Sequence, residues 1–412
     1  MSLRLLIVIA VALIGCAEAA AQSRPAVEAQ FRDWLAGAIW PLASREGVSA
    51  ETFNAAFAGV SLQWDLPDLV PPGSAPPETR HQSQAEFRSP AAYFSESSLR
   101  AQAETGRALA ARHRDALARI TQRYGVPGHI LIAIWGRESA FGRASIPHSA
   151  LDVLATKAFM STRRDLFLTE LVAALKILER GDIAPAAMKS SWAGAMGQPQ
   201  FLPSSYLKYA VDFDGDGRRD IWNSVPDTLA SIANYLAQSG WESGRDWGFE
   251  VAIPQNVSCA QEGPDRARPI ADWAAMGITR ITGAPFPDHE RRLAGMMLVP
   301  AGRHGPEFIV TPNFYAIKEY NNSDTYALYV GNLGDRIAYG MGAFQAAWGD
   351  VGHMLRSDIR AIQETLHAQG YNVGGADGLP GFKTRRSIGE WQLRAGRQQT
   401  CFPNPTLLEI LG

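Results

Sequence analysis

One glutamate interrupts an apolar stripe in a segment with helical spacing. Ile130, Ile134, Glu138 and Phe141 follow one another at intervals of four, four and three residues, so an α-helix would place them on one face. A carboxylate is costly to bury in its charged form, and desolvation raises its pKa. A carboxyl group that still holds its proton near neutral pH can act as a general acid, as glycosidases require. Glu138 is therefore the candidate catalytic residue.

Two arginines beside this glutamate offer a structural alternative. Arg137 precedes it and Arg143 follows shortly after. An ion pair with either of them would make Glu138 a stabilising charge at the helix end rather than a catalyst. Gly142 is expected to end the helix and to leave space beside the glutamate side chain.

A short acidic loop has the spacing of the calcium-binding loop of EF-hands. Its first, third, fifth and ninth positions are Asp212, Asp214, Asp216 and Asp220. Gly217 stands at the sixth position, where the chain must turn sharply, and Arg218 would add its backbone carbonyl to a Ca²⁺ ion. The twelfth position holds Asn223 in place of the usual bidentate Glu. Because the loop contains no histidine, we expect a structural metal rather than one that activates water; the alternative is a solvated loop without metal.

The segments that must position these residues are expected to be mostly helical. Amphipathic periodicity and helix-boundary residues predict helices over residues 113–124, 166–180, 228–239 and 357–371, and helical patterning also covers residues 22–65. Asp165 and Asp227 precede two of these helices. Pro127 is expected to lie in the first turn of the helix that carries Glu138. Strands are predicted over residues 249–253, 297–300 and 308–311, and a loop over residues 66–90. The expected fold class is mainly α with a small β element (α+β).

The composition is typical of a globular protein with two or three domains. The 412 residues are 46% apolar and 19% charged, which supplies a sizeable core. The net charge of −2 lacks the basic excess of nucleic-acid binders, so no nucleic-acid partner is expected. The chain has no H-E-x-x-H pattern and no G-x-S-x-G elbow, which argues against a zinc protease and a serine hydrolase.

Residues 1–21 have the pattern of an export signal. Arg4 precedes an apolar run over residues 5–15, shorter than the roughly 20 residues of a membrane span and typical of a secretory signal. Leu-Ile-Gly-Cys at residues 13–16 matches a bacterial lipobox, which would make Cys16 a lipidated anchor of an outer-membrane lipoprotein; the small residues 17–21 offer an ordinary cleavage site instead. Either route predicts a periplasmic protein.

Two further cysteines remain after export. The periplasm is oxidising, so Cys259 and Cys401 can form a disulfide that ties the C-terminal segment to the main domain. They can equally be two separate buried thiols, because sequence spacing does not determine connectivity.

The last 60 residues have their own apolar periodicity. An amphipathic segment over residues 357–371 precedes residues 376–388 and the pair Trp391-Gln392. This pattern resembles the small three-helix peptidoglycan-binding domain that is fused to cell-wall enzymes, and implies such a domain over residues 353–412. The alternative is a helical appendage that only packs against the main domain.

Three sequence blocks resemble the membrane-bound lytic murein transglycosylase B family. Ile-Trp-Gly-Arg-Glu-Ser-Ala-Phe-Gly at residues 134–142 resembles its catalytic motif, and residues 191–206 and 313–326 resemble its second and third signatures. The blocks occur in family order. The resemblance implies a lysozyme-like catalytic domain over residues 25–349, with an EF-hand-like loop at residues 212–227, that acts on peptidoglycan glycan strands.

The resemblance also assigns roles to single residues. Glu138 matches the catalytic Glu, and Asp227 matches the residue that closes the Ca²⁺ site, although Asp227 can instead cap the following helix. The positions that match residues lining the sugar-binding groove are Tyr93, Ser191, Gln200, Tyr235, Tyr320, Asn321 and Tyr326. Pro199 departs from the family pattern, in which a small polar residue is expected, and this affects the backbone near Gln200.

The chemistry that the resemblance implies is non-hydrolytic. Protonated Glu138 would donate to the β-1,4 glycosidic oxygen between N-acetylmuramic acid and N-acetylglucosamine. It would then take the proton from the muramic acid 6-hydroxyl as a 1,6-anhydro ring closes. One carboxylate suffices for an intramolecular nucleophile, whereas a hydrolase usually uses a second about 5–9.5 Å away. The alternatives are a muramidase-type hydrolase and a non-catalytic peptidoglycan-binding protein. A monomer is expected.

Overall fold

The computed structural model describes residues 22–75 and 90–411, so the export signal and Cys16 lie outside the described residues. The chain divides into two compact units. The first comprises Met1–Glu78, His148–Met188 and Trp192–Gly194, and the second comprises Thr79–Pro147, Lys189–Ser191 and Ala195–Gly412. Among the described residues, no helix has the length and apolarity needed to cross a membrane.

The first unit is built from short helices around two buried ones. Its elements are α1 (Arg24–Trp34), α2 (Trp40–Arg45), α3 (Ala50–Phe57), β1 (His148–Ser149), α8 (Ala150–Met160) and α9 (Arg164–Glu179). Phe159 of α8 packs edge-on against Phe31 of α1, with ring centroids 5.4 Å apart. The helix predicted over residues 166–180 is confirmed as α9, but it begins earlier, so Asp165 lies in its first turn rather than before it.

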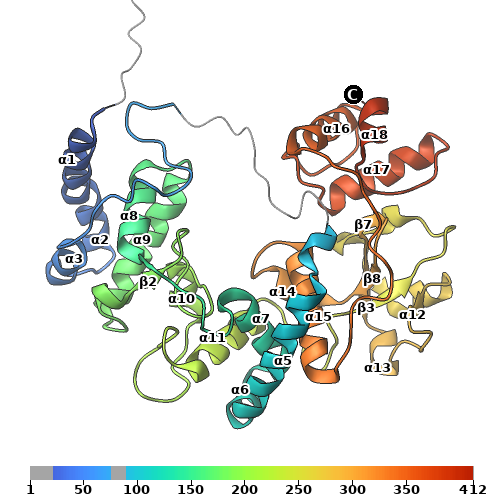
Figure 1. Cartoon of the computed structure of the whole chain (residues 1–412), viewed down its shortest axis with the longest axis horizontal. Helices are drawn as coiled ribbons and strands as arrows, with labels where there is room; N and C mark the ends of the chain where they lie inside the picture. The colour runs from blue at the N-terminus through green and yellow to red at the C-terminus, as the bar shows by residue number, and fades with distance from the viewer. Residues whose placement is uncertain (1–21, 76–89, 412) are drawn as a thin grey trace, which may run out of the picture. The chain divides into compact units, whose positions relative to one another are not determined.

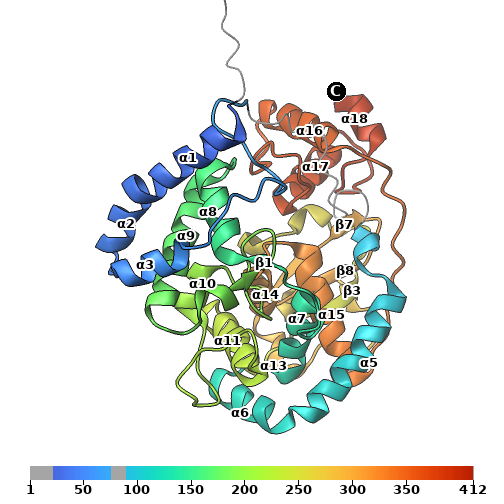
Figure 2. The ribbon, with the colours of Figure 1, turned by 60° about the vertical axis from the view of Figure 1, so that its left-hand side comes forward.

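The second unit contains a helical core with α7 at its centre. Its helices are α5 (Glu96–Arg112), α6 (Arg114–Tyr124), α7 (Gly128–Ser139), α10 (Pro203–Tyr209), α11 (Val225–Gln238), α14 (Pro312–Lys318) and α15 (Asp324–Tyr339), with the short strand β2 (Lys189–Ser190). Residues 130–136 are buried without interruption, as expected for a helix surrounded by protein. α7 packs against α5, α11 and α15, and both views show it beside α15 (Figure 1, Figure 2).

A small antiparallel sheet packs beside these helices. Its strands are β3 (Gly248–Ala252), β4 (Arg268–Pro269), β5 (Thr279–Arg280), β6 (Ala294–Leu298) and β8 (Glu307–Val310), in the order β4-β6-β8-β3-β5. Ile309 of β8 pairs with Phe249 on one side and Met297 on the other. The three strands predicted from the sequence are therefore confirmed in position, with ends shifted by a few residues. β7 (Pro300–Arg303), α12 (Ile270–Ala275) and α13 (Asp288–Arg291) complete this region.

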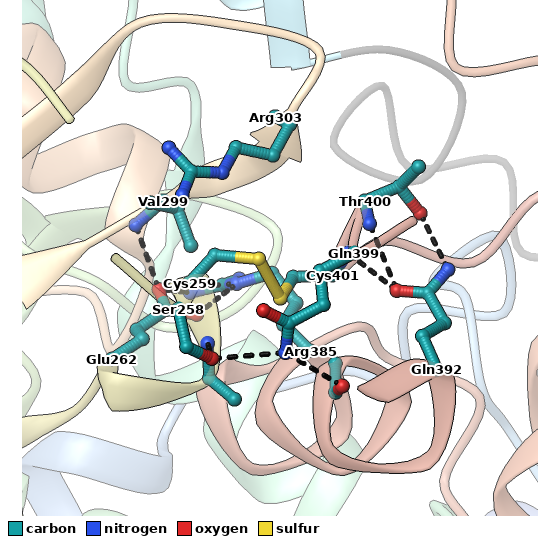
Figure 3. Close-up of a disulfide and its surroundings, with 12 residues drawn as sticks. Ser258, Cys259, Glu262, Val299, Arg303, Arg385, Gln392, Gln399, Thr400 and Cys401 are labelled. Atoms are coloured by element: carbon teal, nitrogen blue, oxygen red, sulfur yellow. Dashed lines mark hydrogen bonds and ion pairs between the residues drawn. A yellow bond between two sulfur atoms is a disulfide. The ribbon is translucent and has the colours of Figure 1, made fainter. Parts of the chain in front are cut away.

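The C-terminal helices α16 (Arg356–Ala368), α17 (Phe382–Arg394) and α18 (Pro405–Leu411) enclose an apolar core of their own. The predicted three-helix domain is thus confirmed. A disulfide between Cys259 and Cys401 joins this domain to the sheet region (Figure 3). Gly389 of α17 permits the close approach, because a Cβ there would lie 2.3 Å from the Cys401 Sγ. The mainly α fold with a small sheet agrees with the sequence prediction.

Candidate functional site

Glu138 lies in the last turn of α7, just before an unusual backbone turn. The helix begins after Pro127, which occupies the extended N-cap position rather than the first turn. It ends at Ser139, and the next three residues all have left-handed backbone conformations, with φ of 49° at Ala140, 61° at Phe141 and 75° at Gly142. The prediction that Phe141 shares a helical face with Glu138 is therefore wrong. Left-handed φ is unfavourable for residues other than glycine, so neighbouring contacts must stabilise this turn.

Packing and hydrogen bonds supply those contacts. The Phe141 ring is buried edge-on against Trp135, with centroids 5.6 Å apart, and a Cβ at Gly136 would lie 2.6 Å from that ring. Ser139 Oγ accepts a hydrogen bond from the backbone N–H of Gly142 at 3.0 Å. The helix thus ends at Ser139, one residue after Glu138, and the prediction that Gly142 ends it is wrong.

The Glu138 carboxyl group is partly buried and, among the described residues, has one direct side-chain hydrogen-bond partner. Tyr326 donates its hydroxyl to Glu138 Oε1 at 2.6 Å. Burial raises the pKa of Glu138 to about 7, while the Tyr326 hydrogen bond and the charge of Arg137 act in the opposite direction. Burial also raises the pKa of Tyr326 well above its usual value, so this hydroxyl keeps its proton and remains the donor.

Arg137 is held by two tyrosines. Its guanidinium lies over the rings of Tyr93 and Tyr329, 4.6 and 4.9 Å from their centroids. It also donates to the Tyr93 hydroxyl at 2.7 Å. Arg137 therefore faces aromatic rings and influences Glu138 through its field, which is weaker than the ion pair considered as the alternative.

A chain of aromatic rings extends from Tyr326. Tyr320 stacks on Tyr326 with centroids 6.3 Å apart and planes 10° apart, and Tyr235 follows at 4.7 Å from Tyr320. Tyr320 donates its hydroxyl to the Pro199 carbonyl, and Tyr235 donates to the Glu319 carbonyl, both at 2.7 Å. Rings from α11, α15 and the turn before α15 are thus locked into one cluster beside Glu138.

The second sequence block attaches to α7 through Gln198 rather than Gln200. Gln198 Oε1 accepts from Trp135 Nε1 at 2.8 Å, and its Nε2 donates to the Trp222 carbonyl at 2.9 Å. Gln200 has a left-handed backbone with φ of 54°, and its amide donates to the Gly197 carbonyl at 2.9 Å. Sequence reasoning missed Gln198, because two glutamines separated by one residue give no sign of which one is buried.

The predicted groove residues fall into three groups. The aromatic cluster consists of Tyr326, Tyr320 and Tyr235. Gln200 is next to Pro199, whose carbonyl accepts the hydrogen bond from Tyr320. Tyr93 reaches the catalytic region through Arg137. Ser191 shares a turn with Ala195, whose N–H bonds to the serine Oγ at 3.3 Å, and Asn321 is exposed in the turn before α15. No sequence pattern indicated Tyr329, which lies one helical turn from Tyr326 on α15 and supports Arg137.

The acidic loop brings three carboxylates together. Oxygens of Asp212, Asp214 and Asp227 lie within 4.8 Å of one another. Asp227 is fully buried and accepts backbone N–H groups of Phe213, Asp214 and Asp220 at 2.8, 3.2 and 2.9 Å. Burial raises its pKa despite these bonds. Three hard oxygen donors converging on one point fit a Ca²⁺ ion.

Two details of this loop differ from expectation. Ser224 caps α11 by accepting the N–H of Asp227 at 3.3 Å, so the alternative that Asp227 is the helix cap is wrong. Asp216 lies outside the group of three carboxylates, and its Oδ1 accepts the N–H of Arg218 at 2.8 Å. The helix begins earlier than predicted, which frees Asp227 to face the loop.

Comparison with known proteins extends these observations. The transglycosylase SLT domain family matches residues 30–335, and the peptidoglycan binding domain family matches residues 356–411. Membrane-bound lytic murein transglycosylase B of Escherichia coli K12 is 37% identical over 230 residues, which are 55% of this chain and 61% of that relative. The chain thus spans less than two thirds of this curated relative.

Solved structures resemble the chain over more of its length. SltB3 from Pseudomonas aeruginosa in complex with NAG-NAM-pentapeptide is 39% identical, with a TM-score of 0.83, and the match covers 93% of this chain and 99% of that one. Its complex with NAG-anhNAM-pentapeptide matches at 37% identity and a TM-score of 0.80, over 92% and 99% of the two chains. Escherichia coli Slt35 in complex with calcium is 31% identical, with a TM-score of 0.52 over 64% of this chain and 81% of that one.

The family match covers most of the chain, and the described fold places the end of α7 with Glu138, the aromatic cluster and the acidic loop in the second unit. This chain belongs to the transglycosylase SLT domain family and carries a C-terminal peptidoglycan binding domain.

Proposed function

We propose that the protein is a lytic transglycosylase that cleaves peptidoglycan without water, with Glu138 acting first as acid and then as base. The observation that carries this proposal is the burial of the Glu138 carboxyl group, which raises its pKa to about 7. With this pKa the group can hold a proton, donate it and later take one back. Its one direct side-chain partner, the Tyr326 hydroxyl, orients Oε1. General acid–base groups work best with a pKa near the operating pH.

The proposed reaction conserves protons and electrons. Protonated Glu138 donates to the β-1,4 glycosidic oxygen between N-acetylmuramic acid and N-acetylglucosamine, and the C1–O4 bond breaks. The muramic acid 6-hydroxyl oxygen then bonds to C1, and the Glu138 carboxylate takes its proton. The products are a new N-acetylglucosamine 4-hydroxyl and a 1,6-anhydromuramic end, and Glu138 returns to its protonated form.

The known relatives support this chemistry. SltB3 has been solved with a NAG-NAM and with a NAG-anhNAM pentapeptide, and the second of these contains the anhydro sugar that the proposed reaction forms. We assign the same substrate class to this chain. The aromatic cluster of Tyr326, Tyr320 and Tyr235 would line the sugar groove, with Tyr93, Ser191, Gln200 and Asn321 around it.

The test is product analysis with a Glu138→Gln variant. Glutamine keeps the size of the side chain and an acceptor for Tyr326, but it cannot deliver or take a proton. We expect turnover of purified sacculi to fall about 10³-fold, the middle of the range for general acid–base groups. Glu104→Gln, on the exposed side of α5, is the matched control and should behave as wild type.

Mass spectrometry of the products distinguishes the alternatives. Anhydro ends from the wild type support the proposal, and hydrated reducing ends would indicate a muramidase-type hydrolase. Full activity in Glu138→Gln would refute the role of this residue, and a wild type that binds sacculi without releasing fragments would indicate a binding protein.

The remaining parts extend the same proposal. Asp212, Asp214 and Asp227 would hold a structural Ca²⁺ ion, with the Arg218 carbonyl as a further ligand predicted from the sequence. Asp216, the other ligand predicted from the sequence, lies outside this group. The calcium complex of Slt35 supports this site. The C-terminal domain would bind peptidoglycan strands, and the export signal predicts a periplasmic protein, with Cys16 as the lipid anchor if the lipobox is used.

A further inference from the structure

We propose that Arg385, in the C-terminal domain, is a positioning residue for Glu138. Through Asp324 it holds the first turn of α15, and with it Tyr326, against the catalytic carboxyl group. This inference rests on the proposed role of Glu138 and gives the C-terminal domain a part in the reaction besides substrate binding.

Arg385 is a buried arginine that connects two parts of the second unit. Its Nε and Nη2 donate to the Glu262 carboxylate, with the shortest contact at 2.6 Å, and its Nη1 donates to the Pro380 carbonyl at 2.7 Å. Glu262 is also fully buried and accepts the N–H of Val299 at 2.9 Å. Figure 3 shows this pair beside the disulfide. The Nη2 of Arg385 has a second acceptor, Asp324 Oδ2, at 2.8 Å.

Asp324 is the point where the C-terminal domain reaches the catalytic helices. It is the first residue of α15, and Lys318, the last residue of α14, donates to its other oxygen at 2.8 Å. Burial alone would raise the pKa of Asp324, but Arg385 and Lys318 lower it to about 2, so it stays charged. Glu262, Arg385, Asp324 and Lys318 thus alternate in charge and sum to zero, which makes their burial tolerable.

The segment between Lys318 and Asp324 carries the aromatic side of the site. Tyr320 lies in this segment, stacks on Tyr326 and bonds to the Pro199 carbonyl. Tyr326 lies two residues into α15, where Ser323 accepts its N–H at 3.2 Å. Because Asp324 closes the segment at one end and Lys318 at the other, Arg385 constrains both Tyr320 and Tyr326. A shift of this segment would move the hydroxyl away from Glu138.

The neighbouring residue on α17 provides a matched control. Arg386 also crosses to the same loop, donating to the Glu262 carbonyl and to Asp265 at 2.8 Å. It does not reach Asp324 in the described contacts. Arg386 and Arg385 therefore share the contact between domains and differ in the connection to α15, while the Cys259–Cys401 disulfide holds the domain in place in either variant.

The experiment compares three variants of the full chain. R385M/E262Q removes the buried charges together, so that Glu262 is not left unpaired. D324N breaks the connection at its other end with an isosteric side chain. R386M is the control. Each is compared with the wild type in kcat and KM on a NAG-NAM-pentapeptide polymer, in the pH dependence of kcat, and in the titration of the Glu138 carboxyl carbon by NMR, which is assigned by its loss in Glu138→Gln.

We expect R385M/E262Q and D324N to lower kcat about 10-fold with KM changed less than twofold, because a small displacement of a catalytic contact slows the reaction. The Glu138 titration should move to higher pH, since the Tyr326 hydrogen bond lowers its pKa. Arg137 and Tyr320 also influence the pKa of Glu138 or of Tyr326, and neither residue is substituted in these variants. R386M should match the wild type in all three measurements.

Wild-type kcat and titration in folded R385M/E262Q or D324N would overturn the proposal, as would an equal loss in R386M. If R385M/E262Q does not fold, D324N alone decides. The titration also separates this inference from the proposed function: activity that survives Glu138→Gln would refute the catalytic role, whereas the NMR shift tests the position of Tyr326 independently.

Discussion

At the scale of single residues, the site depends on opposing influences on one carboxyl group. Burial raises the pKa of Glu138 and favours its protonated form, whereas a hydroxyl donor and a nearby guanidinium favour its charged form. With a pKa of about 7, about half of the molecules hold the proton at neutral pH. A group that must be an acid in one step and a base in the next benefits from this balance.

This balance predicts a pH dependence for the enzyme. The first step needs protonated Glu138, so kcat should fall as the pH rises through about 7. Tyr326→Phe removes the hydrogen bond that lowers this pKa. The fall of kcat on the alkaline side, the alkaline limb of the pH profile, should therefore move to higher pH. The value of kcat at its optimum should fall about 10-fold, because Oε1 loses its orientation. The measurement is initial rate against pH on solubilised glycan strands.

Tyr339→Phe is the control for this prediction. Tyr339 ends α15 and is 67% exposed, so its hydroxyl should be dispensable. A limb that moves to lower pH in Tyr326→Phe, or one that does not move, would contradict the role of this hydrogen bond.

At the scale of elements, the sequence predicted most helices and strands but not the ends that matter for the site. Periodicity and boundary residues located α6, α11 and α16, because their buried residues repeat with the helical period. Periodicity placed Phe141 on the face of α7, whereas the chain leaves the helix at Ser139. Three successive left-handed residues are unfavourable locally and depend on contacts with Trp135, Gly136 and Ser139, which hydrophobic periodicity does not reveal.

The acidic loop shows the same limit. Asp before a helix is a good cap signal, yet Ser224 takes that position and Asp227 turns inward to bind three backbone N–H groups. The family resemblance predicted that Asp227 is a metal ligand, whereas local helix rules favoured a cap. The aromatic cluster was likewise found through resemblance, because tyrosines at these spacings are otherwise typical of a core.

The convergence of carboxylates predicts stabilisation by calcium. A metal ion whose free concentration is about 100 times its Kd adds roughly 2.7 kcal/mol to the free energy of unfolding. This should raise the Tm of the wild type by about 5 °C relative to EDTA-treated protein. Asp214→Asn should abolish most of this shift, because it removes one of the three converging carboxylates. Asp214 is exposed, so the substitution should have little other effect on stability. Differential scanning calorimetry with Ca²⁺, Mg²⁺ and EDTA is the measurement.

Asp216→Asn is the matched substitution in the same loop. Its side chain lies outside the three-carboxylate group, so most of the Ca²⁺ shift should remain. A wild type whose Tm is the same in Ca²⁺ and EDTA would rule out the metal site.

At the scale of the whole molecule, the C-terminal domain is held by covalent and ionic contacts. The disulfide closes a sequence separation of 142 residues, and Arg386–Asp265 and Arg266–Glu390 add ion pairs at its sides. Closing a loop of this length stabilises a protein by roughly 5 kcal/mol in the chain-entropy estimate, and measured values are usually lower.

Cys259→Ala with Cys401→Ala should therefore lower the free energy of unfolding by about 2–5 kcal/mol. The ion pairs should keep the folded domain attached, so turnover of sacculi at 25 °C should remain near wild type. The measurement is urea unfolding with and without dithiothreitol. The reductant should destabilise the wild type and leave the double variant unchanged; equal stability of the two oxidised proteins would contradict the prediction.

The bond between Cys259 and Cys401 also bears on avidity. A binding module on a flexible linker samples many distances, and its effective concentration at the catalytic centre depends on linker length. Here the disulfide fixes the C-terminal domain to the sheet region. A glycan strand could therefore bind the C-terminal domain and the catalytic domain at once only if its length and shape match the distance between the two binding sites. On the proposed function, the fixed domain would make the protein selective for glycan strands of matching geometry, in addition to keeping it near the wall.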